Sequence, residues 1–388
     1  VCEEELLGFL GSHNVLPEYG FPSDVVALRT SHLEHIPEAA HVRLTRPLRQ
    51  AISDYAPGSQ VVAAKRVWTS AGLFPRPAQD WRSFEYAICP TCRLFYREVQ
   101  LDQTRCKVCG GSLYTPTTHR GKYIIPEFGF LASAETKATG ERRPDRTYSS
   151  QTFFSDYDSQ RWSEQDELPL EDIDGLARGS LRVERKYSRY GKLVVVNSGE
   201  KDAGFSICGT CGWGERNAAV VRKGGSRKST GHPNPKTGKP CQGNLLEHGN
   251  IHLGHEFLTD VLELRLRGSG EDPYNWSLWL SLLYAVLEGA SEALNIARDD
   301  LDGTLHPYEE REAPALILFD SVPGGAGHVR RVADNLGAVL QAALERVSHT
   351  ECGEETSCYG CLRNFANQRV HDDLKRGLAR DFLRRYLG

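Results

Sequence analysis

The order of hydrophobic and polar positions predicts a mixed architecture in the last third of the chain. The apolar run ALILFD at 315–320 is typical of a buried strand, and the longer apolar stretch at 276–296 predicts a buried helix. A further helix is expected at 329–347, and apolar residues at helical spacing predict a final amphipathic helix at 374–386. The segment VLELRLR at 261–267 fits either a strand or a helix. We therefore expect this part of the chain to be α/β.

The first two thirds of the chain contain shorter periodic segments. Leucines at 6–10 indicate a short helix, and an amphipathic helix is expected around 44–55. Residues 61–73 favour strands, and alternating stretches at 122–130 and 193–196 continue the β-rich character. This region is therefore predicted to be built mainly from strands.

The composition is ordinary for a globular protein, with 39% hydrophobic and 25% charged residues and a net charge of −4. The longest apolar run, 278–287, is too short to cross a bilayer, and the acidic opening at 1–5 does not fit a signal peptide. We therefore expect a cytoplasmic protein with no membrane partner. Of the 11 cysteines, eight form Cys-x-x-Cys pairs, which in such a chain indicate metal ligands and not disulfides.

The first group of cysteines has two such pairs. Cys89 and Cys92 are separated by 13 residues from Cys106 and Cys109. Zinc is held by four tetrahedral ligands, and each pair can direct two thiolates at one ion. The glycines at 110–111 suit the tight turn that follows the second pair. The spacing predicts a zinc ribbon.

The second group contains one pair, Cys208 and Cys211, and a zinc ion would need two more ligands. We expect Cys241 and His232 to supply them, with His248 as the alternative to His232. A redox-active pair is the competing interpretation, but the surrounding sequence lacks a thioredoxin-like βαβ pattern.

The third group places Cys352, Cys358 and Cys361 within ten residues, which indicates a metal site that lacks a fourth local cysteine. His349 is the nearest candidate for that ligand. An open fourth position would suit catalytic zinc, but cysteine-rich ligand sets are typical of structural zinc, which we favour. With this group, two or three zinc ions are expected. Other candidates for the fourth ligand are His371 and Cys2.

These observations predict an α+β fold: a multi-part zinc-binding scaffold with zinc-ribbon insertions, a β-rich middle and an α/β C-terminal part. The expected domains are an N-terminal α/β segment at 1–85, a zinc ribbon at 86–115, a β-rich segment with an acidic loop at 116–205, a second zinc knuckle with a basic loop at 206–248, and an α/β zinc-binding domain at 249–388.

The loop enclosed by the second group is the most basic part of the chain, and no acidic residue lies between 216 and 246. Lysine and arginine bind phosphates and release counterions, which gives salt-dependent affinity without base preference. A solvated insertion with no ligand is the competing interpretation. The candidate nucleic-acid-binding residues are Arg222, Lys223, Arg227, Lys228, Lys236 and Lys239.

Motifs for catalysis are weak. The strings GGSRKST and KTGKP lack the spacing of a phosphate-binding P-loop, so no ATPase site is recognised. The segment at 316–328 has a predicted strand, a glycine loop and then a helix, and the loop could hold an anion near Asp320 and His328. A tight structural turn is the simpler interpretation of that loop. His252, His255 and Glu256 lack the further ligands of a zinc protease.

Several strings are similar to those of a known family. The two most specific are LFDSVPGGAGHV at 318–329 and SCYGCLRNFANQRVHDDLKRGLA at 357–379. The others are VLPEYGFPSDVV (15–26), YAPGSQVV (55–62), PEFGF (126–130), RPDRTY (143–148), IHLGHEFLTDVLELRL (251–266) and LYAVLEGASEALNI (283–296). Together they resemble the MrfA-type zinc-binding C-terminal region of superfamily-two DEAD/DEAH-box helicases, a group with bacterial DNA-repair and anti-phage defence members.

The resemblance implies the C-terminal accessory part of an ATP-dependent DNA helicase, with DNA and upstream motor domains as partners, and with partner proteins of a repair or defence system as a further possibility. In that family the terminal cluster generally has four cysteines; Cys352, Cys358 and Cys361 match it, and the fourth position is not a cysteine here. The alternatives are a stand-alone zinc-dependent nuclease or hydrolase, and a protein-interaction scaffold.

Overall fold

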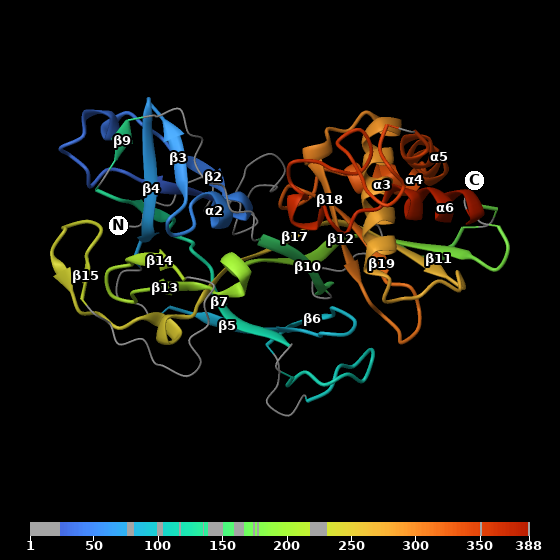
Figure 1. Ribbon diagram of the computed structural model, residues 1–388, viewed down its shortest axis with the longest axis horizontal. Coiled ribbons are helices and arrows are strands. Elements are labelled where there is room, and N and C mark those ends of the chain that lie inside the picture. Colours follow the sequence, from blue (N-terminus) through green and yellow to red (C-terminus); the bar gives the residue numbers. More distant parts are fainter. Residues whose placement is uncertain are drawn as a thin grey trace.

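The computed structural model describes residues 24–75, 81–98, 104–115, 118–134, 136–138, 150–158, 167–173, 175–176, 178–217, 231–349 and 351–386. Strands and helices are both abundant, which confirms the α+β class. Figure 1 shows strands of the N-terminal part and the hairpin of β15 at one end, helices of the C-terminal part at the other, and long strands running between them. The helix predicted at 6–10 lies outside the described residues.

An N-terminal sheet has the strand order β2-β1-β8-β4-β3, with β9 paired to β4. The helix expected at 44–55 is shorter than predicted, because Pro47 ends a short strand in an extended conformation and the helix starts only after it. The bounds are β1 Val25–Arg29, β2 Thr45–Pro47, α2 Leu48–Asp54, β3 Gln60–Ala63, β4 Arg66–Leu73, β8 Phe130–Ala132 and β9 Lys137–Ala138.

A second sheet is organised around two antiparallel 16-residue strands, β12 and β17. Its order is β10-β12-β17-β7-β5-β6, with β11 on β12 and β19 pairing both β17 and β18. The segment at 261–267 is thus strand: Val261 packs into the core beside the N-terminal sheet, and Leu262 and Leu264 pack under the helices. The bounds are β5 Ser83–Ile88, β6 Phe95–Arg97, β7 His119–Ile124, β10 Ser150–Tyr157, β11 Glu167–Asp172, β12 Arg182–Asn197, β17 His252–Arg267, β18 Leu301–His306 and β19 Ala315–Asp320.

The C-terminal helices cover the face of this sheet that carries Leu262 and Leu264. The helix expected at 329–347 is divided in two, because Asn335 has a non-helical backbone (φ −125°, ψ 29°) and its side chain donates to the carbonyl of Arg331. No helix among the described residues has the length and apolarity needed to cross a membrane. The bounds are α3 Trp276–Leu294, α4 His328–Asp334, α5 Leu336–Val347 and α6 Arg376–Tyr386.

Two small hairpins complete the described chain. β13 (Phe205–Ile207) pairs with β14 (Gly214–Arg216), and β15 (His232–Pro233) pairs with β16 (Pro240–Cys241). The first of them joins the N-terminal sheet through a bridge between Gly72 and Trp213. The five domain boundaries given above stay predictions.

The close packing of α3 on α5 depends on Gly289. A Cβ atom at this position would lie 2.5 Å from the carbonyl oxygen of Val339 and 2.6 Å from the backbone nitrogen of Ala343. We predict that Gly289→Ala lowers the free energy of unfolding by about 1–3 kcal/mol, because the two backbones must separate. Urea denaturation measures this change.

Gly337 on α5 offers a matched control, because it is exposed and a Cβ atom added there would have Leu176 Cδ1 as its nearest neighbour, at 3.7 Å. Gly337→Ala is expected to raise the free energy of unfolding by about 0.5–1 kcal/mol through helix propensity. Equal effects of the two substitutions would contradict the packing argument.

Candidate metal centres

The first cysteine group lies at one end of the β5–β6 hairpin. Cys89 and Cys92 occupy the turn between these strands, and Cys106 and Cys109 lie on a second tight turn. The Sγ–Sγ distances are 3.5 Å for Cys89–Cys109 and 3.5 Å for Cys92–Cys106. The hydroxyl group of Tyr96 donates to Cys106 Sγ at 3.2 Å. The structure therefore brings all four sequence-predicted ligands together.

The second group joins two hairpins. Cys208 and Cys211 lie in the turn between β13 and β14, while His232 and Cys241 are cross-strand partners in β15 and β16. His232 Nε2 lies 3.3 Å from Cys211 Sγ, and its ring stacks on Trp213 with centroids 4.6 Å apart. His232 thus joins the three sulfurs. His248, the alternative ligand, lies in the 3-10 turn at 246–249 and is not a member of the group.

The third group follows α5 and ends before α6. Cys361 Sγ lies 3.8 Å from Cys352 Sγ and 3.7 Å from Cys358 Sγ. His349 completes the group with a ring nitrogen; its Nε2 atom is buried without a hydrogen-bond partner, and its Nδ1 atom accepts the N–H of Glu351. The alternative ligand His371 is engaged elsewhere, by Asn364 and Asn367. Cys2 lies outside the described residues.

The spacing of the sulfurs fits zinc and excludes disulfides. Four ligands about 2.3 Å from a tetrahedral zinc ion are about 3.8 Å apart, whereas bonded sulfurs are about 2.05 Å apart. The ten cysteines that the structure describes are all free. Burial raises the pKa of the Cys211 and Cys361 thiols to about 12. A divalent cation would offset that cost of burying thiolates, so the donor sets fit zinc.

Residues outside the ligand sets hold the third centre in place, and the sequence patterns did not single them out. Arg376, 3% exposed, donates to the carbonyl groups of Val347 and Cys352 at 2.9 and 3.0 Å. Arg346 donates to the carbonyl of Cys361 at 3.3 Å. A guanidinium has several donors in a fixed plane, which lets one side chain join helix and loop.

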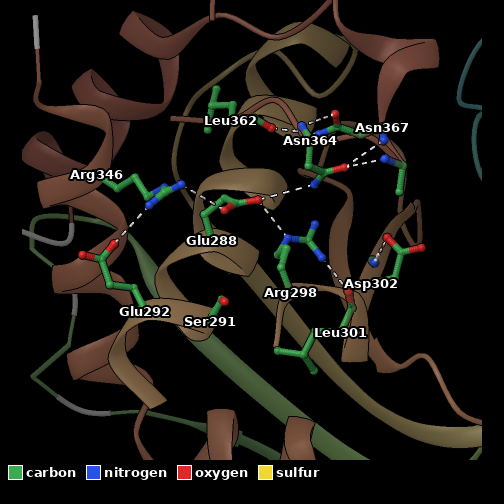
Figure 2. A network of polar contacts seen from close by, with 12 residues as sticks. Glu288, Ser291, Glu292, Arg298, Leu301, Asp302, Arg346, Leu362, Asn364 and Asn367 are labelled. Atoms are coloured by element: carbon green, nitrogen blue, oxygen red, sulfur yellow. Dashed lines mark hydrogen bonds and ion pairs between the residues drawn. The ribbon is translucent and has the colours of Figure 1, made fainter. Parts of the chain in front are cut away.

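Figure 2 shows the buried carboxylate at the centre of this support. Glu288 on α3 is 7% exposed, and its carboxylate accepts hydrogen bonds from Arg298 Nε at 2.9 Å and from Asn364 Nδ2 at 3.4 Å. The same carboxylate forms an ion pair with Arg346 at 3.4 Å. A charge inside an apolar helix is stabilised only when it is paired, so Glu288 ties α3 to the segment after Cys361. The signal in the sequence was that Glu288 directly follows the apolar run at 278–287.

The predicted basic residues are only partly placed. Arg222, Lys223, Arg227 and Lys228 lie outside the described residues. Lys236 and Lys239 lie in the turn between β15 and β16 and are exposed. The structure thus places two of the six cations beside the second metal group.

The backbone N–H groups of the glycine loop bind carboxylates of this chain. The buried carboxylate of Asp320 accepts the N–H groups of Ala326, His328 and Val329 at 2.6, 3.0 and 2.9 Å, and Asp260 accepts that of Gly327 at 3.0 Å. The loop N–H groups that could have bound an external anion are therefore satisfied within the chain. The loop is a structural turn.

The His252, His255 and Glu256 string does not form a metal group. Residues three apart on a strand point to opposite faces, and here His252 bonds Tyr86 Oη at 2.7 Å while His255 faces Asp24 at 3.5 Å. Glu256 pairs with Arg97. The two histidines therefore do not converge on a common point.

Comparison with known proteins gives a family match for the segment that holds the third centre. Residues 282–362 match the MrfA Zn-binding domain, and all four members of the third group fall inside that segment. The chain thus carries an MrfA-type zinc-binding domain, which confirms the resemblance seen in the sequence.

A curated relative matches nearly the whole chain. Over 428 residues the chain is 28% identical to the Druantia protein DruE of Escherichia coli (strain UMEA 4076-1), and the match covers 99% of this chain. It covers 22% of the relative, so the chain spans about a fifth of that protein's length.

Solved structures of the DUF1998 helicase MrfA are more distant. The DNA-bound form has a TM-score of 0.39 and 12% identity, over 93% of this chain and 33% of that one. The form bound to DNA and AMPPNP has a TM-score of 0.25 and 13% identity, over 71% of this chain and 28% of that one. Likenesses this low establish nothing further about the present chain.

The fourth ligand of the third centre can be tested by zinc content. We predict that His349→Ala removes about one zinc ion per chain, whereas His349→Cys retains it, because a thiolate can replace the imidazole. Structural zinc contributes on the order of 10 kcal/mol to small modules, so the loss should also lower the thermal stability of this part of the chain. Zinc is measured by plasma mass spectrometry after dialysis.

His371→Ala is the matched control and should keep the full zinc content. If His371→Ala lost zinc and His349→Ala did not, the assignment of His349 would be wrong.

Proposed function

We propose that this chain is the zinc-stabilised C-terminal accessory region of a bacterial ATP-dependent DNA helicase that acts in DNA repair or phage defence. The observation that carries the proposal is the third Cys/His group, which lies within the segment that matches the MrfA Zn-binding domain. The likeness to DruE over nearly the whole chain supports the same assignment. The motor domains would belong to the remainder of a longer polypeptide, and the compartment would be the reducing cytoplasm.

An accessory role is favoured over a zinc-dependent nuclease or hydrolase by the ligand sets. Each of the three groups offers four protein ligands, so a tetrahedral ion in it would have no open position for water or substrate. Zinc would then act by holding loops together. The twelve proposed ligands are those predicted from the sequence, and three ions are expected if every group is filled.

The role in DNA contact is assigned to the basic loop enclosed by the second group. In sequence, four of its cations (Arg222, Lys223, Arg227 and Lys228) lie between β14 and β15. The other two, Lys236 and Lys239, are exposed in the turn between β15 and β16. Such a loop would bind phosphates without reading bases. A scaffold that binds only other proteins would not need it.

DNA binding by the 388-residue chain tests this role. We expect binding at low salt, with an affinity that falls steeply as salt rises, and we expect replacement of Arg222, Lys223, Arg227 and Lys228 by Gln to weaken it about tenfold or more. Fluorescence anisotropy with a labelled oligonucleotide measures both effects.

Arg384→Gln with Arg385→Gln is the matched control, because these cations lie on α6 near acidic residues, and Arg385 is paired with Glu271. Affinity should change little. Absence of binding at low salt would contradict DNA contact and leave the protein-interaction scaffold as the better account.

A further inference from the structure

The side chains of Arg29 and Lys236 both lie over the aromatic ring of Phe74, and Lys236 belongs to the hairpin that carries two ligands of the second metal group. Phe74 follows β4, and the guanidinium carbon of Arg29 lies 4.2 Å from the centroid of its ring. Lys236 Nζ lies 3.8 Å from the same centroid. Arg29 is the last residue of β1, and Lys236 belongs to the β15–β16 turn, so three distant segments of the chain meet here.

No carboxylate among the described residues pairs with the charges of this cluster. In the part of the chain that the structure describes, neither Arg29 nor Lys236 forms an ion pair with a carboxylate, and Arg29 Nε is buried without a hydrogen-bond partner. The pKa of Lys236 is lowered by partial burial and then by the charge of Arg29. The ring attracts each cation, but it cannot replace the hydrogen bonds that an anion would accept.

His32 lies near Lys236 but adds no positive charge of its own. His32 Nε2 lies 2.9 Å from the carbonyl oxygen of Ala132, and its Nδ1 atom is buried without a partner. Its pKa is lowered by burial and, to a smaller extent, by the positive charge of Lys236. A neutral imidazole that donates through Nε2 has a lone pair on Nδ1. The positive charge around Phe74 therefore comes from Arg29 and Lys236, and the unpaired donor is Arg29 Nε.

The backbone fixes the position of Lys236. Asn234 accepts the N–H of Lys236 through Oδ1 at 2.9 Å, and the N–H of Gly238 bonds the carbonyl of Asn234 at 2.8 Å. Lys239, in the same turn, contacts no aromatic ring among the described residues. The backbone of Lys239 is also held, since its carbonyl accepts the N–H of Asn234 at 2.9 Å, so the two lysines differ in the ring that holds the Lys236 ammonium. Preorganised donors bind an anion at lower entropic cost.

We propose that Arg29 and Lys236, supported by Phe74, form a binding site for a phosphate group, and that its ligand is the sugar-phosphate backbone of a nucleic-acid strand. The inference rests on the proposed function and deepens it by assigning a fixed contact outside the basic loop. A polyanion is favoured over free phosphate because the site adjoins a stretch without acidic residues from 217 to 246. Each such contact releases counterion from the strand.

The test compares Arg29→Met, Lys236→Met and the double variant with Lys239→Met in the 388-residue chain. Methionine keeps the apolar contact with the ring and removes the charge. We expect Arg29→Met and Lys236→Met each to weaken binding of a labelled DNA oligonucleotide by about three- to tenfold, and to lower the slope of log affinity against log salt by about one. The double variant should be little weaker than either single variant, because both side chains hold one phosphate.

Lys239→Met controls for the loss of one charge from the same turn, and it should have a smaller effect that adds to that of Arg29→Met. Melting curves and zinc content show whether each variant is folded. If folded Arg29→Met binds with unchanged affinity and slope, the site is refuted, while a loss of binding on neutralising the basic loop would still support the proposed function.

A calorimetric titration with inorganic phosphate at matched ionic strength separates the two sources of phosphate. If Arg29→Met abolishes binding of inorganic phosphate and leaves oligonucleotide binding unchanged, the ligand is a free phosphate and the nucleic-acid assignment is wrong. If the unsubstituted chain binds the oligonucleotide, and inorganic phosphate at millimolar concentration does not displace it, the assignment is supported.

Discussion

The burial of β17 on both faces is the constraint from which the rest of the architecture follows. Phe257 and Val261 pack toward the N-terminal sheet, and Leu262 and Leu264 pack under the C-terminal helices. One strand thus contributes to two cores, and neither core can lose it without exposing apolar surface. Its pairing with β12, β7 and β19 also sets where the outer strands lie, including β5 and β6, which carry the first metal group.

The hairpin that supplies two ligands of the second metal group lies where apolar burial is scarce. The β15–β16 hairpin has two residues in each strand, which is too few to close a core of its own. Four ligands around one ion would fix such a segment, because the binding free energy of the metal becomes folding free energy. The third group differs, since Arg376 and Arg346 donate to its backbone carbonyl groups, and Glu288 pairs with Arg346. These contacts tie the group to three helices. That centre is therefore part of the helical unit and not an appendage.

Local patterns were sufficient for the strands and helices with simple environments. The strand at 315–320 and the apolar helix from Trp276 were predicted closely. A buried strand and a buried helix differ in the length of their apolar run and in the residues that flank it. The segment at 261–267 stayed ambiguous, since a strand buried on two faces loses part of its alternation. The break at Asn335 depends on one backbone conformation, which hydrophobic spacing does not report.

The cysteine spacing predicted which residues gather, and the structure groups them as expected, with His232 and His349 as the nearest histidines. It could not predict the cluster at Phe74, because Arg29 and Lys236 are more than 200 positions apart and each is ordinary in its local sequence. The same holds for Asp320, whose role in the glycine loop depends on three backbone N–H groups brought to it by the turn.

The close approach of two glycines has a mechanical consequence. Gly72 and Gly212 leave no room for a side chain, since a Cβ on Gly72 would lie 2.0 Å from the carbonyl oxygen of Gly212, and that carbonyl accepts the N–H of Leu73 at 2.7 Å. The second metal group is thereby fastened directly to β4. Tension applied to the β13–β14 hairpin would pass along this backbone hydrogen bond into the N-terminal sheet. The hairpin and the sheet would then move together under load.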